Sequence, residues 1–146
     1  MEDRRIPVFL DACILMAAAH SPSGGSALVI EVCQGRRFKA AVTVKVLLEA
    51  RLNIAEKFDE ADLIRFYQLL AALDPEMIPL PATEKLDQYK SLITQKDVHV
   101  LAAALQCGAD YLITLDRRHL ITPLILAAGL AIKIMTPGDF LKEIAH

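Results

Sequence analysis

The chain has 146 residues, close to the roughly 150 of one domain, and 54% of them are hydrophobic, which excludes a disordered or low-complexity protein. Lys and Arg number 16 and Asp and Glu number 18, for a net charge of −2, so nucleic-acid binding would require a local basic patch or a metal ion. Aromatic residues make up only 5% and Trp is absent, which argues against a base-stacking platform.

Short apolar runs alternate with longer segments of helical periodicity along the chain. The pattern predicts strands at 6–10, 38–42, 77–80, 111–114 and 131–135. It predicts helices at 12–19, 26–33, 44–58, 60–73, 82–91, 98–107 and 124–128, and a last helix capped by Thr136. The inner face of helix 60–73 is expected to carry Ile64, Tyr67, Leu70 and Ala71. Apolar strands separated by helices predict an α/β domain with a parallel sheet covered on both faces.

The cysteines and the N-terminal run bear on where the protein acts. Cys13, Cys33 and Cys107 are odd in number and share no metal-ligand spacing, which indicates reduced thiols in the cytoplasm. The apolar run 6–10 is shorter than the about 7–15 residues of a secretion signal. The run 120–132 is shorter than the about 20 residues of a membrane span. We therefore expect one cytoplasmic domain over 1–146, without a membrane partner.

Acidic residues stand near the ends of predicted strands, where open parallel sheets carry their ligand sites. Asp11 follows the first strand directly, Asp116 lies two residues beyond the fourth, and Asp97 opens the helix before the fourth. Each of the three also stands where a helix is expected to begin. Because Asp is a favoured N-cap, capping is the alternative interpretation for each of them.

A fourth acid, Glu49, lies in the helix after the second strand. That helix is apolar over most of its circumference, and Lys45, Glu49 and Asn53 form its one narrow polar stripe. Two placements of the stripe remain open. It faces water, with Glu49 paired to Lys45 at i, i+4, or it faces a polar cleft.

Convergence of these four acids would create a site for a cation. Several carboxylates in one cleft repel, and some stay partly protonated unless a cation joins them. Oxygen ligands without Cys or His suit Mg²⁺ or Mn²⁺.

Basic side chains and histidines near the acids allow two interpretations. Arg117 and Arg118, directly after Asp116, are the nearest candidates for contacts with substrate phosphates. A second basic cluster at 36–39 is explained equally well by a solvated turn. His99 and His119 flank two of the acids, and we expect both to be helix-surface or packing residues.

Three blocks of the sequence resemble the PIN-domain family, metal-dependent nucleases that include the VapC-type toxins of type II toxin–antitoxin systems. They are VFLDACIL at 8–15, KDVHVLAAA at 96–104 leading into GADYLITLD at 108–116, and IMTPGDFL at 134–141. The resemblance covers 6–144. The loop 21–26 and Glu49 are also similar to a subfamily described as toxin components.

The resemblance implies a fold, a site and partners. The fold would be a three-layer α/β/α sandwich with a central, mostly parallel sheet. Asp11, Glu49, Asp97 and Asp116 would bind Mg²⁺ or Mn²⁺ and cleave RNA phosphodiester bonds, with Thr114 hydrogen-bonding nearby. The implied partners are an RNA substrate and a small cognate antitoxin, and a homodimer is one possible assembly.

One departure and two alternatives accompany this hypothesis. Many family members have polar residues directly after the first Asp, where this chain has Ala12 and Cys13, so a polar group beside the site is expected to be lost. The first alternative is a catalytically silent PIN-like domain that binds nucleic acid or protein. The second is a receiver-like signalling domain, which requires a Lys after its last strand; here Lys133 lies within that strand and Thr136 follows it.

Overall fold

A parallel sheet forms the centre of the fold. The computed structural model of the protein describes residues 4–145, in which the strands are β1 (Ile6–Leu10), β2 (Phe38–Val42), β3 (Glu76–Met77), β4 (Tyr111–Ile113) and β5 (Lys133–Met135). Their order is β3-β2-β1-β4-β5, and every neighbouring pair is parallel. From β1 the chain first builds one half of the sheet and then returns to build the other, so the direction of winding reverses between β1 and β4.

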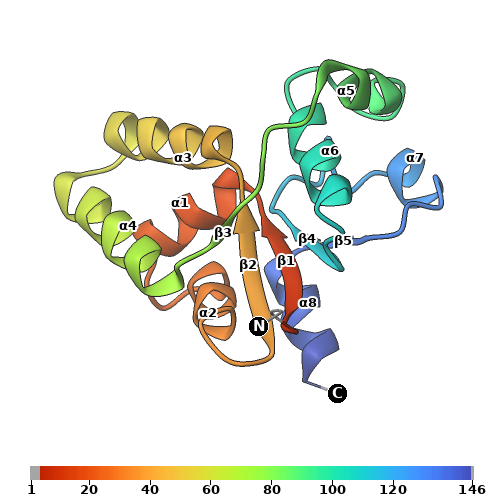
Figure 1. Ribbon diagram of the computed structural model, residues 1–146. Coiled ribbons are helices and arrows are strands. Elements are labelled where there is room, and N and C mark those ends of the chain that lie inside the picture. The colour runs from red at the N-terminus through yellow and green to blue at the C-terminus, as the bar shows by residue number, and fades with distance from the viewer. Residues whose placement is uncertain (1–3, 146) are drawn as a thin grey trace.

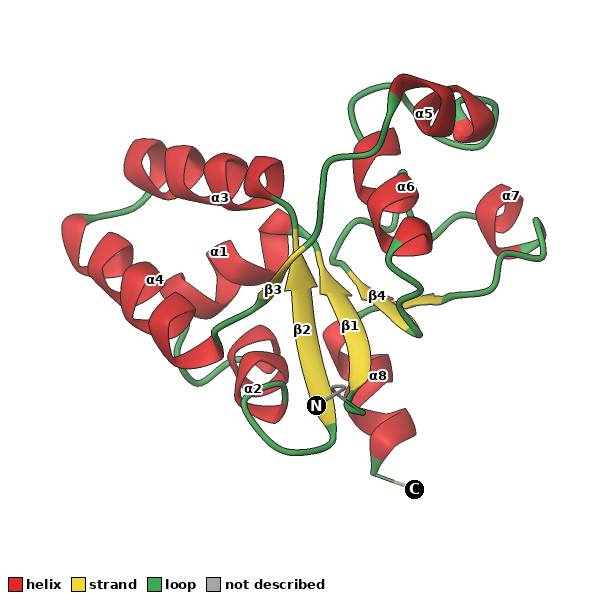
Figure 2. Ribbon diagram, viewed as in Figure 1, coloured by secondary structure: helices red, strands yellow, loops and turns green. Residues whose placement is uncertain are grey.

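Helices cover both faces of the sheet, as the α/β prediction requires. They are α1 (Ala12–His20), α2 (Gly25–Val32), α3 (Val44–Lys57), α4 (Glu60–Leu73), α5 (Thr83–Tyr89), α6 (Val98–Gln106), α7 (Pro123–Leu126) and α8 (Pro137–Ile144). Helix α1 packs against α2, α3 and α4, whereas α5 packs on α6 and α6 contacts β4. Figure 1 shows α1 to α4 on one side of the sheet and α5 to α7 on the other, and Figure 2 shows the same arrangement by element type. The three-layer α/β/α prediction is confirmed.

The buried helix α6 fixes the position of the residue that precedes it. Its residues 98–104 are all buried, and most of them are Ala, Val or Leu. A helix that is apolar on every side must be enclosed by other elements, here the sheet on one side and α5 on the other. Asp97, directly before this helix, is therefore held at a defined place at the edge of the core.

The third strand is shorter than predicted and begins one residue earlier. The sequence predicts a strand over 77–80, whereas β3 is Glu76–Met77. The Ile78 N–H still donates to the Val42 carbonyl at 2.8 Å. Pro79 and Pro81 have no N–H, so the hydrogen-bond ladder cannot continue beyond this point.

Helix α4 has the predicted bounds but turns a different face inward. Ile64 and Tyr67 are 52% and 50% exposed, and the buried side chains are Asp62, Phe66 and Leu73. Of the predicted inner-face residues, Leu70 is half-buried against the core and Ala71 is exposed. The prediction was wrong for Ile64, Tyr67 and Ala71 because periodicity counts apolar residues only. Here a hydrogen-bonded aspartate occupies the inner face and sets the rotation of the helix.

Two expectations concern the chain as a whole. Over residues 4–145 the structure contains no single helix that is long and apolar enough to cross a membrane; α1 and α2, bent by 109°, satisfy the length and composition test only as a pair. The expected single domain, 1–146, includes residues 1–3 and 146, which lie outside the described residues. That organisation remains a prediction.

Candidate active site

The site lies where the winding of the sheet reverses. Asp11 follows β1, and its N–H donates to the Ile113 carbonyl at 3.2 Å, which extends the pairing with β4 by one residue. Asp116 follows β4 after Thr114 and Leu115. The crevice beyond the carboxyl ends of such adjacent strands is the usual ligand site of an open α/β sheet.

All four acids singled out from the sequence line one cavity of about 340 Å³, here called the acid cavity. Its other polar lining residues are Cys13, Asn53, Lys57 and Lys96. Periodicity left the direction of Glu49 open, and in the structure Glu49 faces a polar cleft and not a solvated surface. The polar stripe of α3 continues through Asn53 to Lys57 along this wall of the acid cavity.

Thr114 connects the carboxylates of the two strand ends. Its hydroxyl donates to Asp11 Oδ2 at 2.7 Å and accepts the N–H of Asp116 at 3.0 Å. Thr114 is fully buried, and Asp11 Oδ1 also caps α1 by accepting the Ala12 N–H at 2.8 Å. Asp11 therefore caps a helix and also lines the acid cavity, so capping does not exclude a place in the candidate site.

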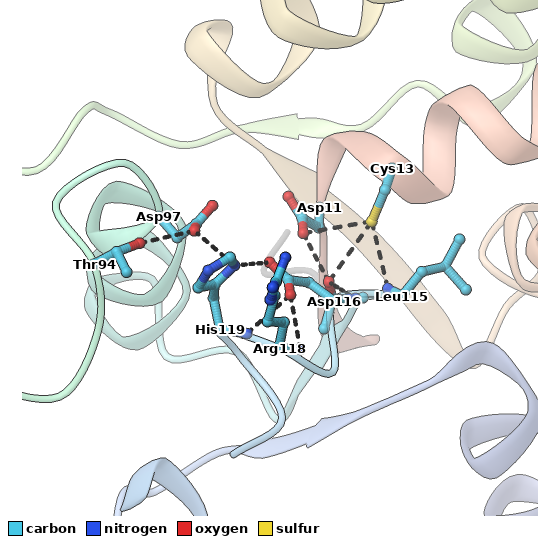
Figure 3. Close-up of polar contacts among 9 residues, drawn as sticks. Asp11, Cys13, Thr94, Asp97, Leu115, Asp116, Arg118 and His119 are labelled. Atoms are coloured by element: carbon cyan, nitrogen blue, oxygen red, sulfur yellow. Dashed lines mark hydrogen bonds and ion pairs between the residues drawn. The ribbon is translucent and has the colours of Figure 1, made fainter.

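Cys13 supplies the polar group that the sequence comparison expects to be lost. Its Sγ donates to Asp11 Oδ2 at 3.5 Å and accepts the Leu115 N–H at 3.4 Å (Figure 3). Burial, followed by the Asp11 charge, raises the pKa of the Cys13 thiol to about 12, so the S–H proton stays available for donation. The expected loss is therefore wrong, because sulfur replaces oxygen at this place.

Asp97, Asp116 and His119 form the tightest group of ligand atoms in the site. His119 Nδ1 lies 3.3 Å from Asp116 Oδ2 and 3.7 Å from Asp97 Oδ2, and Figure 3 shows the imidazole between the two carboxylates. One ligand atom from each residue lies within 4.8 Å of the others, a spacing suited to a metal ion. Thr94 donates its hydroxyl to Asp97 Oδ2 at 3.0 Å and holds that carboxylate in place.

His119 and Asp116 differ from the sequence expectations. Asp116 caps no helix; its Oδ1 accepts the N–H groups of Arg118 and His119, at 3.0 and 2.9 Å, within a turn. His119 lies in that turn and not on a helix surface. The Asp-x-x-His spacing is the signal in the sequence that could have identified it, because such turns bring residues i and i+3 together.

The electrostatics of the acid cavity favour a cation. Burial raises the pKa of Asp11, although hydrogen bonds from Thr114 and Ala12 oppose the rise. Burial also raises the pKa of Glu49, and the negative charge of Asp11 adds to that effect. Ionised carboxylates are therefore costly here, and a divalent cation would offset that cost. The four carboxylates suit a hard divalent cation such as Mg²⁺ or Mn²⁺.

The basic residues near the site have three different placements. Lys57 and Lys96, which were not predicted from the sequence, line the acid cavity. Arg117 lines a separate cavity with residues of the loop 21–26, and Arg118 is exposed beside Asp116. The cluster at 36–39 precedes and enters β2, so it lies at the opposite end of the sheet.

Comparison with known proteins identifies the family. A family profile described as PIN domain matches residues 7–118, and no curated protein matches the chain. Similar solved structures include VapBC2 from Rickettsia felis bound to a DNA fragment from their promoter (TM-score 0.66, 16% identity, covering 90% of this chain and 98% of that chain). FitAcB from Neisseria gonorrhoeae gives a TM-score of 0.61 at 13% identity, covering 90% of this chain and 98% of that chain. VapC20 from Mycobacterium tuberculosis, a sarcin-ricin loop cleaving toxin, gives a TM-score of 0.52 at 12% identity, covering 86% and 98%. The profile spans more than half of the chain and the fold agrees with it, so the chain belongs to the PIN domain family.

Proposed function

We propose that the protein is a metal-dependent endoribonuclease that hydrolyses RNA phosphodiester bonds. The observation that carries this proposal is the meeting of Asp11, Glu49, Asp97 and Asp116 in one cavity at the carboxyl ends of β1 and β4. These acids come from parts of the chain far apart in sequence, and capping does not explain Glu49 or Asp97. Helix capping by Asp97 would require a side-chain bond to the backbone of α6, and within residues 4–145 it makes none.

The residues that would hold a divalent metal ion are the four acids, with His119 beside two of them. Mg²⁺ or Mn²⁺ bound there supplies Lewis acidity toward the scissile phosphate and toward the attacking water. The protein supplies orientation. Thr114 and Cys13 hold the Asp11 carboxylate, Thr94 holds Asp97, and backbone N–H groups hold Asp116.

Basic side chains in and beside the acid cavity would bind the negatively charged phosphates of the substrate. Lys57 and Lys96 line the cavity, so their ammonium groups can approach a phosphate at the site. Arg118 extends from the same turn as Asp116 and is proposed, with Arg117, to contact phosphates farther along the strand. A chain with a net charge of only −2 needs a local basic patch to bind nucleic acid, and these side chains provide one.

The proposed biological role is the toxin of a toxin–antitoxin pair, acting in the cytoplasm, with a small antitoxin as partner. Support comes from the family and from its structural neighbours: VapC20 is a sarcin-ricin loop cleaving toxin, and VapBC2 is bound to a DNA fragment from their promoter. A short DNA-binding gene directly upstream would add support. The homodimer remains a prediction, which a molar-mass measurement on the purified chain decides.

A cleavage assay tests the proposed activity. Purified protein, free of bound partner, is incubated with single-stranded and structured RNA in Mg²⁺, in Mn²⁺ and with chelator, and products are resolved on a denaturing gel. We expect cleavage with metal and none with chelator. Products that persist both in chelator and with Asp116→Asn would come from a contaminating nuclease. Absence of cleavage in Mn²⁺ would favour the catalytically silent, binding-only alternative.

A further inference from the structure

A second cavity adjoins the acid cavity and has no role in the proposed metal chemistry. It encloses about 580 Å³ between α3, α5 and α6, and we call it the side cavity. Its lining includes Lys45, Leu86, Lys90, Gln95, Val98 and His99. The volume lies within the range of about 300–1,000 Å³ that small-molecule sites occupy.

One wall of the side cavity carries a buried polar atom without a partner. His99 is 6% exposed, and its Nδ1 has no hydrogen-bond partner among residues 4–145. Buried polar side-chain atoms are paired in the large majority of cases, and an unpaired one carries a desolvation cost. This nitrogen is closed to solvent, so a group in the side cavity would meet the imidazole of His99, and pairing with Nδ1 would require the ring to rotate.

Neighbouring residues of the same segments line the two cavities. Lys45 lies one turn before Glu49 on α3, a separation of about 6 Å along the helix axis. Gln95 faces the side cavity, and the next two residues, Lys96 and Asp97, face the acid cavity. A polymer bound with one phosphodiester in the acid cavity would therefore place a neighbouring unit at the side cavity.

The chemistry of the lining matches one unit of a nucleic acid. Lys45 and Lys90 are exposed cations suited to a backbone phosphate. Asp87 also lines the side cavity, and its carboxylate lies 3.9 Å from the Lys90 ammonium. Both side chains are exposed, so this pair is too weak to withhold Lys90 from a phosphate. Gln95 carries an amide that can donate and accept at a base edge, and Leu86 and Val98 provide apolar surface for its face.

We propose that the side cavity is a subsite for one unpaired nucleotide of the RNA, next to the phosphodiester that is cleaved. Lys45 and Lys90 hold its phosphate, and Gln95 and the imidazole of His99 hydrogen-bond the Watson–Crick edge of its base. Only an unpaired base exposes that edge, so the subsite selects single-stranded segments and sets a base preference beside the cut. This inference deepens the proposed ribonuclease function and rests on it.

A binding experiment without metal tests the subsite separately from catalysis. The full chain in chelator is titrated with each of the 5′-monophosphates of A, C, G and U, while the imidazole resonances of His99 are followed by NMR. We expect saturable shifts of these resonances with an affinity that differs among the bases. Gln95→Ala should weaken the preferred nucleotide about five- to tenfold, the effect of one lost hydrogen bond.

Lys90 and a neighbouring lysine provide a matched pair of variants. Lys90→Ala should weaken all nucleotides and reduce the slope of log affinity against log salt by about 0.7 for a single-stranded RNA. Lys85→Ala removes an equally exposed charge from α5 outside the cavity lining and should change neither value. His99→Leu should abolish base discrimination; if that variant does not fold, Gln95→Ala alone decides the point.

Cleavage mapping separates failure of the subsite from failure of the proposed function. If the wild-type protein cuts RNA with metal, Gln95→Ala should change which base flanks the cut. Active enzyme with the same cut sites and KM in Gln95→Ala, Lys90→Ala and Lys85→Ala would overturn the subsite and leave the ribonuclease proposal standing. Wild-type protein that cuts no RNA would overturn the ribonuclease proposal, while absence of nucleotide-induced shifts at His99 would overturn the subsite directly.

Discussion

Asp11 shows how one residue serves both the fold and the candidate site. One carboxylate oxygen caps α1 and the other accepts the Thr114 hydroxyl and the Cys13 thiol. Its position after a buried strand could be read from the sequence, because strand ends of parallel sheets carry the site. The orientation of the Cys13 thiol could not, since it also depends on the Leu115 N–H, which lies 102 residues away along the chain.

The raised pKa of Asp11 leads to a prediction about stability. A carboxyl whose pKa is raised by folding stabilises the folded state below the ordinary carboxyl range, and this contribution is lost as pH rises through the raised value. At neutral pH without metal, ionised Asp11 therefore destabilises the protein. Asp11→Asn should raise the Tm in chelator by a few degrees, since about 1 kcal/mol shifts Tm by about 2–4 °C at this size.

The same variant should remove the response to metal. Wild-type protein should gain stability with increasing Mg²⁺ or Mn²⁺, because an ion that binds only the folded state stabilises it by mass action. Asp11→Asn should show little or no gain, measured by thermal melts at fixed pH. A wild-type melting curve that is unchanged across millimolar metal, or a variant that melts earlier than wild type in chelator, would contradict this account.

At the scale of elements, an inward-facing aspartate joins α1 to α4. Asp62 on α4 is 3% exposed, and its Oδ2 lies 2.9 Å from His20 Nδ1 at the end of α1. Arg65 donates to the other oxygen of Asp62 and, through Nε, to the Ala19 carbonyl at 2.8 Å. The His20 ring stacks on Phe58 with centroids 4.2 Å apart. These contacts determine which face of α4 is buried.

Removing the Asp62 carboxylate should destabilise the protein in a pH-dependent way. The His20 hydrogen bond, followed by the Arg65 charge, lowers the pKa of Asp62. A lowered carboxyl pKa stabilises the fold above the ordinary carboxyl range, and this contribution is lost as pH falls through the lowered value. Asp62→Ala should therefore melt well below wild type at pH 7, with a smaller difference in acid.

A surface variant provides the control for this comparison. Glu56→Ala on the exposed side of α3 should change stability by no more than about 0.5 kcal/mol at any pH. A constant Tm difference between wild type and Asp62→Ala from pH 7 down to acid would show that lost packing, not the ion pair, accounts for the effect.

Local sequence predicted the bounds of helices and strands better than which side of each element is buried. Strands β1 and β2 and helix α4 have the predicted bounds, because each is a compact pattern closed by charges, Gly or a cap. The missed features depend on partners elsewhere. The length of β3 depends on its pairing with β2 and on the missing N–H groups of Pro79 and Pro81. The rotation of α4 depends on its contacts with α1.

At the scale of the whole molecule, the last helix closes the end of the fold opposite to the site. Phe140 on α8 is fully buried, and its ring centroid lies 5.4 Å from that of Phe38 and 5.0 Å from that of Tyr111. These residues stand at the amino ends of β2 and β4. The aromatic cluster stabilises the sheet without touching the acid cavity.

Shortening the Phe140 side chain tests whether stability can be lost without loss of activity. Phe140→Ala should cost about 3–5 kcal/mol, a large share of the about 5–15 kcal/mol that stabilises a domain. Phe140→Leu should cost less because it leaves a smaller void. Denaturant unfolding measures both variants, and cleavage per folded molecule should equal that of wild type. A loss of activity in protein that is still folded would show that the two ends of the sheet are coupled.

The assembly of the site depends on the topology of the whole chain. That the four acids line one cavity could be predicted, because strand-end positions and a polar stripe mark them. Their distances could not, since Asp11, Glu49 and Asp116 meet only after the chain reverses its winding between β1 and β4. Lys96 escaped prediction because a surface-type lysine carries no local pattern that separates a cavity wall from solvent. The Asp-x-x-His spacing and the i, i+4 spacing from Asn53 could have identified His119 and Lys57.

The most direct test of the central claim compares single and double variants in the RNA cleavage assay. If the four acids act as one metal-binding unit, Asp97→Asn and Asp116→Asn should each reduce cleavage by about a thousandfold or more, and the double variant should be within about tenfold of either. Circular dichroism confirms that each variant is folded. Single variants that retain most of the activity, or losses that multiply in the double variant, would contradict a site built from these carboxylates.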